Sequence, residues 1–266
     1  MRCIARLLMF AILPLIVAAG PRDDFDRPLA VRHVDLGPSE TSPAQHSEVR
    51  CHDYPHFTVK EIDEREVGAA QLSILPRTGA APPCRRANLP GEQVIAEDVW
   101  QGYFAGAWGD MAVFDAADGV NGAMAFAIFR PGDSKPRYTA AAFGSPAFTP
   151  APGGGVLRFS RMVAGDCSVV IDGAACAQRI AAAAGVAPIK VEACRAGYDA
   201  EKRAMARARC ADRKRSDAAC IAAELSGMAS WDASPSVLAI PFAVTFRDGT
   251  ADARPQGAPT ACRPAD

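Results

Sequence analysis

The stretch RCHDYPHF, residues 50–57, gathers a cysteine, two histidines and an aspartate, which are residue types that ligate transition metals or build catalytic sites. Pro55 and the β-rich run that follows it predict a strand rather than a helix. On a strand, His52 and His56 are separated by roughly 13 Å, too far for both to ligate one ion unless the chain bends. We therefore interpret both histidines as polar residues flanking a strand, with a metal site at a bend as the alternative.

A second candidate metal site is DAADGVNG, residues 115–122. Asp115, Asp118 and Asn121 offer the oxygen ligands that Ca²⁺ prefers. Their spacing departs from a calcium-binding EF-hand loop, whereas the Asp-Gly and Asn-Gly dipeptides are typical of tight β-hairpin turns. The sequence therefore predicts a plain turn, with Ca²⁺ as the alternative and no other cofactor.

Hydrolysis by carboxylates is the main enzymatic alternative. Asp110, Asp115 and Asp118 lie near the mouth of the same predicted hairpin, and acid–base chemistry on carboxyl groups leaves no local sequence signature. Ser134, in a GDS motif between predicted strands, follows every histidine of the chain, and we interpret it as a turn residue. The sequence favours a protein that is not an enzyme, and a cleft holding two close carboxylates would reverse that interpretation.

A cluster of basic side chains lies on a predicted helix. Such a helix can bind anionic surfaces, which in a cell envelope are lipopolysaccharide, peptidoglycan stems or an acidic protein. A solvated helix face is the commoner role of such a cluster, and it is our primary interpretation. The cluster consists of Lys202, Arg203, Arg207, Arg209, Arg213, Lys214 and Arg215.

The N-terminus predicts export. Arg2 and Arg6 flank the start of an apolar run over residues 7–17, and small residues follow at Val17-Ala18-Ala19, which is the pattern of a secretory signal peptide. We predict that residues 1–19 are removed by cleavage near Ala19 and that the mature chain is periplasmic or secreted. No later run is long and apolar enough to predict a transmembrane segment.

Charge and composition restrict the partners. The formal net charge of −1 means that the chain has no overall excess of positive charge with which to attract nucleic acid, so we predict no nucleic-acid partner. A cell-envelope component or another protein stays open as the partner. High contents of alanine, arginine, glycine and proline suggest a GC-rich bacterial genome, which would make the destination a periplasm.

The cysteines predict a disulfide framework. Of nine, Cys3 lies in the predicted signal peptide, and the even number that remains is typical of exported proteins. Cys194 and Cys210 lie on one predicted helix about 24 Å apart, so they cannot bond to each other. Among the many pairings that the cysteines permit, we predict Cys51–Cys84, Cys167–Cys176, Cys194–Cys262 and Cys210–Cys220.

The pattern along the chain predicts a mainly β fold. Residues 20–50 are polar and rich in proline, which predicts an extended or disordered leader. Residues 51–266 predict a single domain with an antiparallel sandwich-like or barrel-like core, with a small β-propeller as the alternative. An alanine-rich stretch near residues 172–228 predicts a small helical insertion stapled by disulfides. Pro241 predicts that the last long strand is an edge strand or carries a bulge.

One part of the chain resembles a known group of proteins. The stretches CHDYPHFTVKEIDE, GAAQLSILP and GYFAGAWGDMAVFDAADGVNGAMAFAIF resemble uncharacterised exported proteins of Gram-negative bacteria over residues 51–130. The resemblance implies a shared β core, and it brings neither an activity nor catalytic residues. Taken with the residues above, it leads us to expect a disulfide-stabilised binding or structural protein whose ligand the sequence does not identify.

Overall fold

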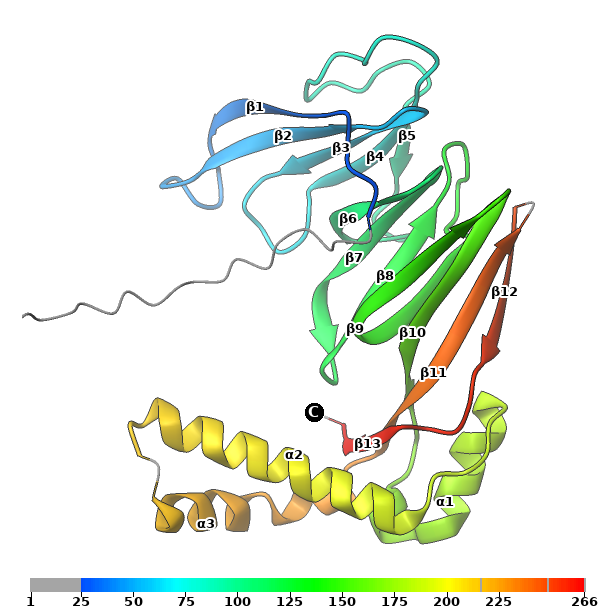
Figure 1. Ribbon diagram of the computed structural model, residues 1–266. Coiled ribbons are helices and arrows are strands. Elements are labelled where there is room, and N and C mark those ends of the chain that lie inside the picture. Colours follow the sequence, from blue (N-terminus) through cyan, green and yellow to red (C-terminus); the bar gives the residue numbers. More distant parts are fainter. Residues whose placement is uncertain (1–24, 216, 248, 266) are drawn as a thin grey trace, which may run out of the picture.

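The computed structural model describes residues 25–215, 217–247 and 249–265, and the predicted signal peptide, residues 1–19, lies outside them. Two antiparallel sheets account for most of the regular structure, and a helical segment interrupts the second. Figure 1 shows the smaller sheet above the larger one and the helices below it. This arrangement confirms the prediction of a mainly β, antiparallel fold with a helical insertion.

The smaller sheet is a five-stranded meander in which each strand pairs with the next. Its central strand is buried along its whole length because one face packs against the larger sheet and the other lies under the loop of residues 77–92. The disulfide Cys51–Cys84 ties this loop to the second strand. The strands are β1 (Ala30–Pro38), β2 (His46–Asp53), β3 (Phe57–Asp63), β4 (Gln71–Pro76) and β5 (Gln93–Ile95).

Strands β1 and β2 occupy much of the segment that we predicted to be an extended or disordered leader. They pair from Ala30 opposite Asp53 to Pro38 opposite His46, so that prediction is wrong for these residues. The strand pattern is hard to see in the sequence because the side chains on one face of β2 include Glu48 and Arg50. Arg50 forms ion pairs with Glu48 and with Glu61 of the neighbouring strand. These ion pairs stand where a typical strand would have apolar contacts.

The larger sheet is also a meander and has eight strands in the order β12-β11-β10-β9-β8-β7-β6, with β13 paired to β11 beside β12. The hairpin of β7 and β8 turns at Asn121 and Gly122, whose φ angles of 55° and 68° fit a tight turn. The strands are β6 (Gly102–Trp108), β7 (Met111–Val120), β8 (Ala123–Phe129), β9 (Tyr138–Ala151), β10 (Gly154–Ala164), β11 (Ser236–Arg247), β12 (Thr250–Pro255) and β13 (Ala261–Pro264).

The larger sheet curls strongly but stays open. Trp108 of β6 stacks on Phe148 of β9 with ring centroids 4.9 Å apart, although three strand spacings of about 4.8 Å would separate them in a flat sheet. The end strands β6 and β12 do not pair with each other within the described residues. The core is therefore made of two packed open sheets, which corrects the barrel-like and propeller alternatives.

Three helices and a short 3₁₀ turn connect β10 to β11. Ser168 and Asp217 cap two of the helices by accepting hydrogen bonds from Ile171 N–H and Cys220 N–H. Gly185, in the left-handed region at φ 67°, ends the first helix. The elements are α1 (Val169–Ala184), α2 (Val191–Asp212), α3 (Ala218–Gly227) and η1 (Ala229–Ala233).

Four disulfides staple this architecture, and all four have the predicted partners. One ties a loop to the smaller sheet, one closes the start of α1, one links α2 to β13, and one joins α2 to α3. The pairs are Cys51–Cys84, Cys167–Cys176, Cys194–Cys262 and Cys210–Cys220.

Candidate functional site

Strand β2 presents alternate side chains to opposite sides of the smaller sheet. Cys51 and Asp53 face the loop side, where Cys51 bonds to Cys84 and Asp53 accepts a hydrogen bond from Thr58. Arg50 and His52 face the larger sheet instead, and Tyr54 follows them. The RCHDYPHF stretch is thus a strand and its turn, as predicted, and half of its polar side chains reach the junction of the two sheets.

A groove of about 350 Å³ lies at this junction, between the smaller sheet, strand β6 and the segment of residues 25–28. Four of its ten lining residues carry aromatic rings. The rings of His52 and Phe104 lie 4.9 Å apart between centroids, and those of Tyr54 and Phe104 lie 6.2 Å apart. The lining residues are Phe25, Asp26, Arg27, Pro28, Val31, His52, Tyr54, Phe104, Ala105 and Gly106.

The segment of residues 25–28 is fixed across the groove by β6. The N–H of Asp26 donates to the carbonyl oxygen of Ala107 at 2.9 Å, and the ring of Phe25 lies 4.8 Å from that of Trp108. Gly106 is needed for this contact, because a Cβ there would meet the Phe25 ring at 2.4 Å. The roof of the groove is therefore a packed part of the fold.

Two neutral polar groups stand in this aromatic wall. Burial, with a smaller contribution from the nearby positive charge of Arg50, lowers the pKa of His52 to about 4, so the imidazole is uncharged at neutral pH. Burial likewise raises the pKa of Tyr54 to about 12, which keeps its hydroxyl protonated. Neither side chain has a hydrogen-bond partner among the described residues. The groove therefore combines an apolar surface with an N–H, an O–H and acceptor atoms that are not engaged.

The low pKa of His52 predicts a loss of stability in mild acid. An unfolded histidine titrates near 6.5, so the unfolded state binds more protons between about pH 6.5 and pH 4, and stability falls as the pH is lowered through this window. Allowing for partial solvent exposure, His52→Gln should reduce that fall by roughly 2 kcal/mol. Urea unfolding at about pH 7 and about pH 4.5 measures the fall in the free energy of unfolding in the wild type and in the variant. His56→Gln, at an exposed position, is the control. An equal effect of both variants would contradict the attribution of the acid-dependent loss of stability to His52.

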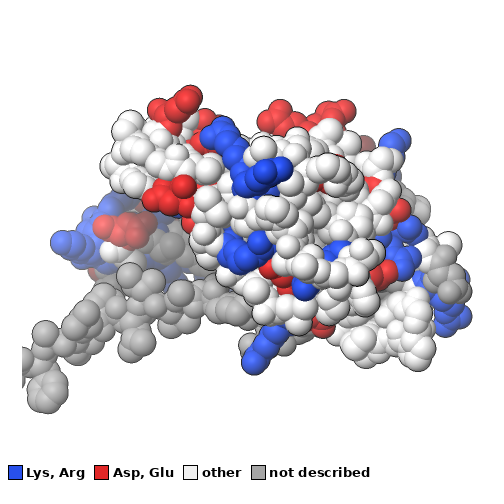
Figure 2. Space-filling view, turned by 90° about the horizontal axis from the view of Figure 1, so that it is seen from above, with Lys and Arg blue, Asp and Glu red and all other residues white. Residues whose placement is uncertain are grey.

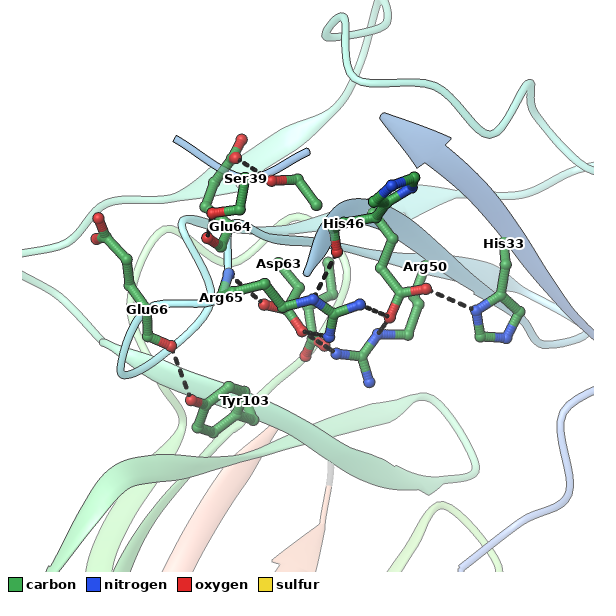
Figure 3. Close-up of polar contacts among 12 residues, drawn as sticks. His33, Ser39, His46, Arg50, Asp63, Glu64, Arg65, Glu66 and Tyr103 are labelled. Carbon is green, nitrogen blue, oxygen red and sulfur yellow. Dashed lines mark hydrogen bonds and ion pairs between the residues drawn. The ribbon is translucent and has the colours of Figure 1, made fainter. Parts of the chain in front are cut away.

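Next to the groove, a half-buried network of charges covers part of the same face of the smaller sheet. One nitrogen of Arg50 lies 3.0 Å from Glu61 and 2.7 Å from Asp63, and Arg65 lies 2.9 Å from the same Asp63 oxygen. Glu48 lies within 3.3 Å of both arginines. Figure 3 shows the two guanidinium groups side by side between His33 and Asp63.

Glu61 connects this network to the larger sheet. Its carboxylate accepts the N–H of Phe104 at 2.7 Å, and the side chain is 2% exposed. Burial raises the pKa of Glu61, although the Phe104 N–H and the Arg50 charge oppose that effect. A second link joins Gly68 N–H to the hydroxyl of Tyr103 at 2.7 Å. These bonds hold β6, one wall of the groove, against the smaller sheet.

The structure separates the other predicted ligands and acids. His56 is exposed in the turn between β2 and β3, whereas His52 lines the groove. Asp110 pairs with Arg130 beyond the N-terminal end of β7. Asp115 and Asp118 lie further along β7, with Cα atoms roughly 17 Å and 27 Å from that of Asp110 in extended chain. The three aspartates therefore do not form a common cleft. Asn121, the third predicted Ca²⁺ ligand, is part of the hairpin turn.

One cluster of three metal-ligating side chains occurs within the described residues. It consists of Cys167, Asp172 and Cys176, whose ligand atoms lie within 4.8 Å of one another. Because the two cysteines are bonded to each other, their sulfurs are not thiolate ligands in the oxidised protein.

Charges of both signs are interspersed on the face of the molecule that is seen from above in Figure 2. Figure 2 shows Lys and Arg side chains mixed with Asp and Glu on a largely uncharged face. A shallow depression of about 450 Å³ on β11 and β12 is lined by Thr, Arg, Asp and Gln side chains and one alanine, with no aromatic ring. It lacks the apolar platform that distinguishes the groove.

Sequence reasoning found His52 but missed the groove around it. Phe25, Tyr54 and Phe104 are isolated in the sequence, and only the packing of the two sheets brings them together. The sole local signal is the alternation of Arg50, His52 and Tyr54, which places three polar or aromatic residues on one face of a strand.

Comparison with models of protein families, with curated proteins and with solved structures finds no match for this chain. In the part of the chain that is described, none of the helices combines the length and the apolar character needed to cross a membrane.

Proposed function

We propose that this chain is an exported, disulfide-stabilised binding protein that takes a small uncharged ligand in the groove between its two sheets. The observation that carries the proposal is the pair of neutral, unengaged polar groups, His52 and Tyr54, in an aromatic wall. Ligand sites are typically apolar clefts with a few polar groups that fix orientation. Four disulfides fit a protein that folds in an oxidising compartment.

The groove supports binding better than catalysis. An imidazole with a pKa of about 4 is a weak general base near neutral pH. The lining residues include no serine, threonine or cysteine that could act as a nucleophile beside it. The carboxylate in the lining, Asp26, accepts a hydrogen bond from Gly109 N–H. Glu61 and Asp63, beside the groove, are engaged by Arg50 and by backbone N–H groups.

The chemistry of the lining defines the ligand class. Aromatic rings favour stacking with a planar or aliphatic group, because such contacts bury apolar surface on both partners. His52 and Tyr54 each provide one donor and one acceptor, which suit a hydroxyl, amine or carbonyl group. Asp26 and Arg27 contribute one charge of each sign to the lining, so a charged group would lose its hydration without meeting a net opposite charge.

N-Phenyl-1-naphthylamine, an uncharged aromatic amine that fluoresces in apolar surroundings, tests the proposal. We expect the native protein to bind it and Val31→Trp to weaken binding at least about tenfold, because the indole fills the groove from its exposed side. Val94→Trp is the matched control: Val31 is 44% exposed on β1 and Val94 is 42% exposed on β5, at the opposite edge of the sheet. Equal binding by all three proteins would refute the proposal.

A further inference from the structure

The second half of α2 and the whole of α3 form a helical hairpin that we term the arm (residues 203–215 and 217–227). Cys210–Cys220 joins its two helices, and Ala206 is fully buried along α2. Helix α3 packs chiefly against α2 and η1. Figure 1 shows the arm extending away from both sheets. It is therefore a rigid projection whose outer face is accessible.

The arm is basic although the chain is not. Residues 203–227 contain six Lys or Arg residues and three Asp or Glu residues, whereas the whole chain has a formal net charge of −1. The excess of cations on the arm is thus a local feature, and it lies on the part of the molecule that projects furthest from the sheets.

The structure divides the predicted basic cluster into two groups. Four of the cations lie within 3.5 Å of a carboxylate. The ion pairs are Lys202–Asp232, Arg209–Glu224, Arg213–Glu224 and Arg215–Asp217. Arg203, Arg207 and Lys214 are exposed and form no ion pair within the described residues. Arg203 and Arg207 are one helical turn apart, so they share a face of α2.

Lys214 occupies a backbone position that ordinarily favours glycine. Its φ is 56°, and it follows the C-cap of α2. Lys214 N–H donates to Ala211 C=O and Arg215 N–H donates to Cys210 C=O, both at 2.8 Å, which is the Schellman arrangement. A lysine here costs backbone energy that glycine would not. This cost is explained if the cation itself is needed at the end of α2.

We propose that the arm docks on a membrane surface rich in anionic phosphate headgroups, through Arg203, Arg207 and Lys214. The residues between these cations on the exposed side of α2 are mainly alanines. They provide neither the large anchor that a protein partner would bury nor the apolar stripe of an inserted amphipathic helix. Charge attraction at the level of the headgroups is the contact that this surface favours.

Vesicle sedimentation with the oxidised full chain tests this docking. We expect binding to phosphatidylglycerol vesicles at low salt, none to phosphatidylcholine vesicles, and release at high salt. The triple variant R203Q/R207Q/K214Q should bind about 100-fold more weakly, at about 1 kcal/mol per cation near the surface. The variant R85Q/K135Q/R158Q changes the net charge equally on other faces and should bind like the wild type.

A single substitution at Lys214 distinguishes the effect of the lost charge on vesicle binding from an effect on the stability of the fold. Lys214→Gly should leave the thermal unfolding temperature unchanged or raised, because glycine suits the left-handed position, and should weaken vesicle binding about fivefold. Failure of the wild type to bind anionic vesicles at low salt would overturn the proposal. Equal weakening by the two triple variants would also overturn it, since global charge would then account for the binding.

Discussion

Replacing Lys60 by methionine is expected to destabilise the fold by about 3–5 kcal/mol, because it leaves a buried carboxylate without its counter-ion. Lys60 Nζ lies 2.6 Å from Glu92 Oε1, and the two side chains are 1% and 0% exposed. The other oxygen of Glu92 accepts the N–H of Leu89 at 2.7 Å. The pair therefore fastens the loop of residues 77–92 over β3.

Urea unfolding near neutral pH measures this loss. The double variant K60M/E92Q should recover most of the lost stability, because it removes the uncompensated charge and keeps an acceptor for Leu89 N–H. Lys135→Met, at an exposed position, should change stability by no more than about 0.5 kcal/mol. A loss below about 1 kcal/mol in Lys60→Met would mean that Glu92 is solvated or protonated in the variant.

Removing the disulfide between Cys194 and Cys262 should cost about 4 kcal/mol. Its sequence separation of 68 is the largest of the four, and in the chain-entropy account the stabilisation grows with the closed loop. The double variant C194A/C262A also loses the covalent link between α2 and β13, and both cysteines are fully or almost fully buried.

The disulfide between Cys167 and Cys176 provides the internal comparison. Its sequence separation is 9, so C167A/C176A should cost about 2.5 kcal/mol in the same account. Chemical unfolding of both double variants under oxidising conditions ranks the two losses. If the short loop costs as much as the long one, strain or contacts in the native state outweigh loop length.

The parts of the fold that the sequence could predict depend on local rules. The turn at Asn121-Gly122 and the alternating strands beside it follow from residues within one hairpin. The disulfide pairs follow from the excluded Cys194–Cys210 pairing and from cysteines that bracket turns. The alanine-rich composition near residues 172–228 was sufficient to predict the helical insertion.

The parts that could not be predicted depend on contacts between distant segments. Strand β2 looks polar because Arg50 is satisfied by Glu61 and Asp63 of the next strand, which no local pattern reveals. Pro241 suggested an edge strand or a bulge, yet β11 lies inside the sheet and pairs with β10 without a register shift. Pro241 has no N–H to donate, and the sheet needs none there, because β12 pairs with β11 only from residue 242 onward and β13 pairs only up to residue 239. The groove is formed by residues of β6 and of the smaller sheet, so it depends on the packing of the two sheets.

The helical segment begins and ends at one place on the larger sheet. Strands β10 and β11 are direct neighbours, with Ala164 opposite Val237, and Gly165 N–H donates to Ser236 C=O at 2.8 Å. Everything between them is, in topological terms, the loop of one hairpin. Such a loop can lengthen, shorten or change its surface while the register of the sheet persists. The arm and the groove therefore belong to separately evolvable modules of one chain.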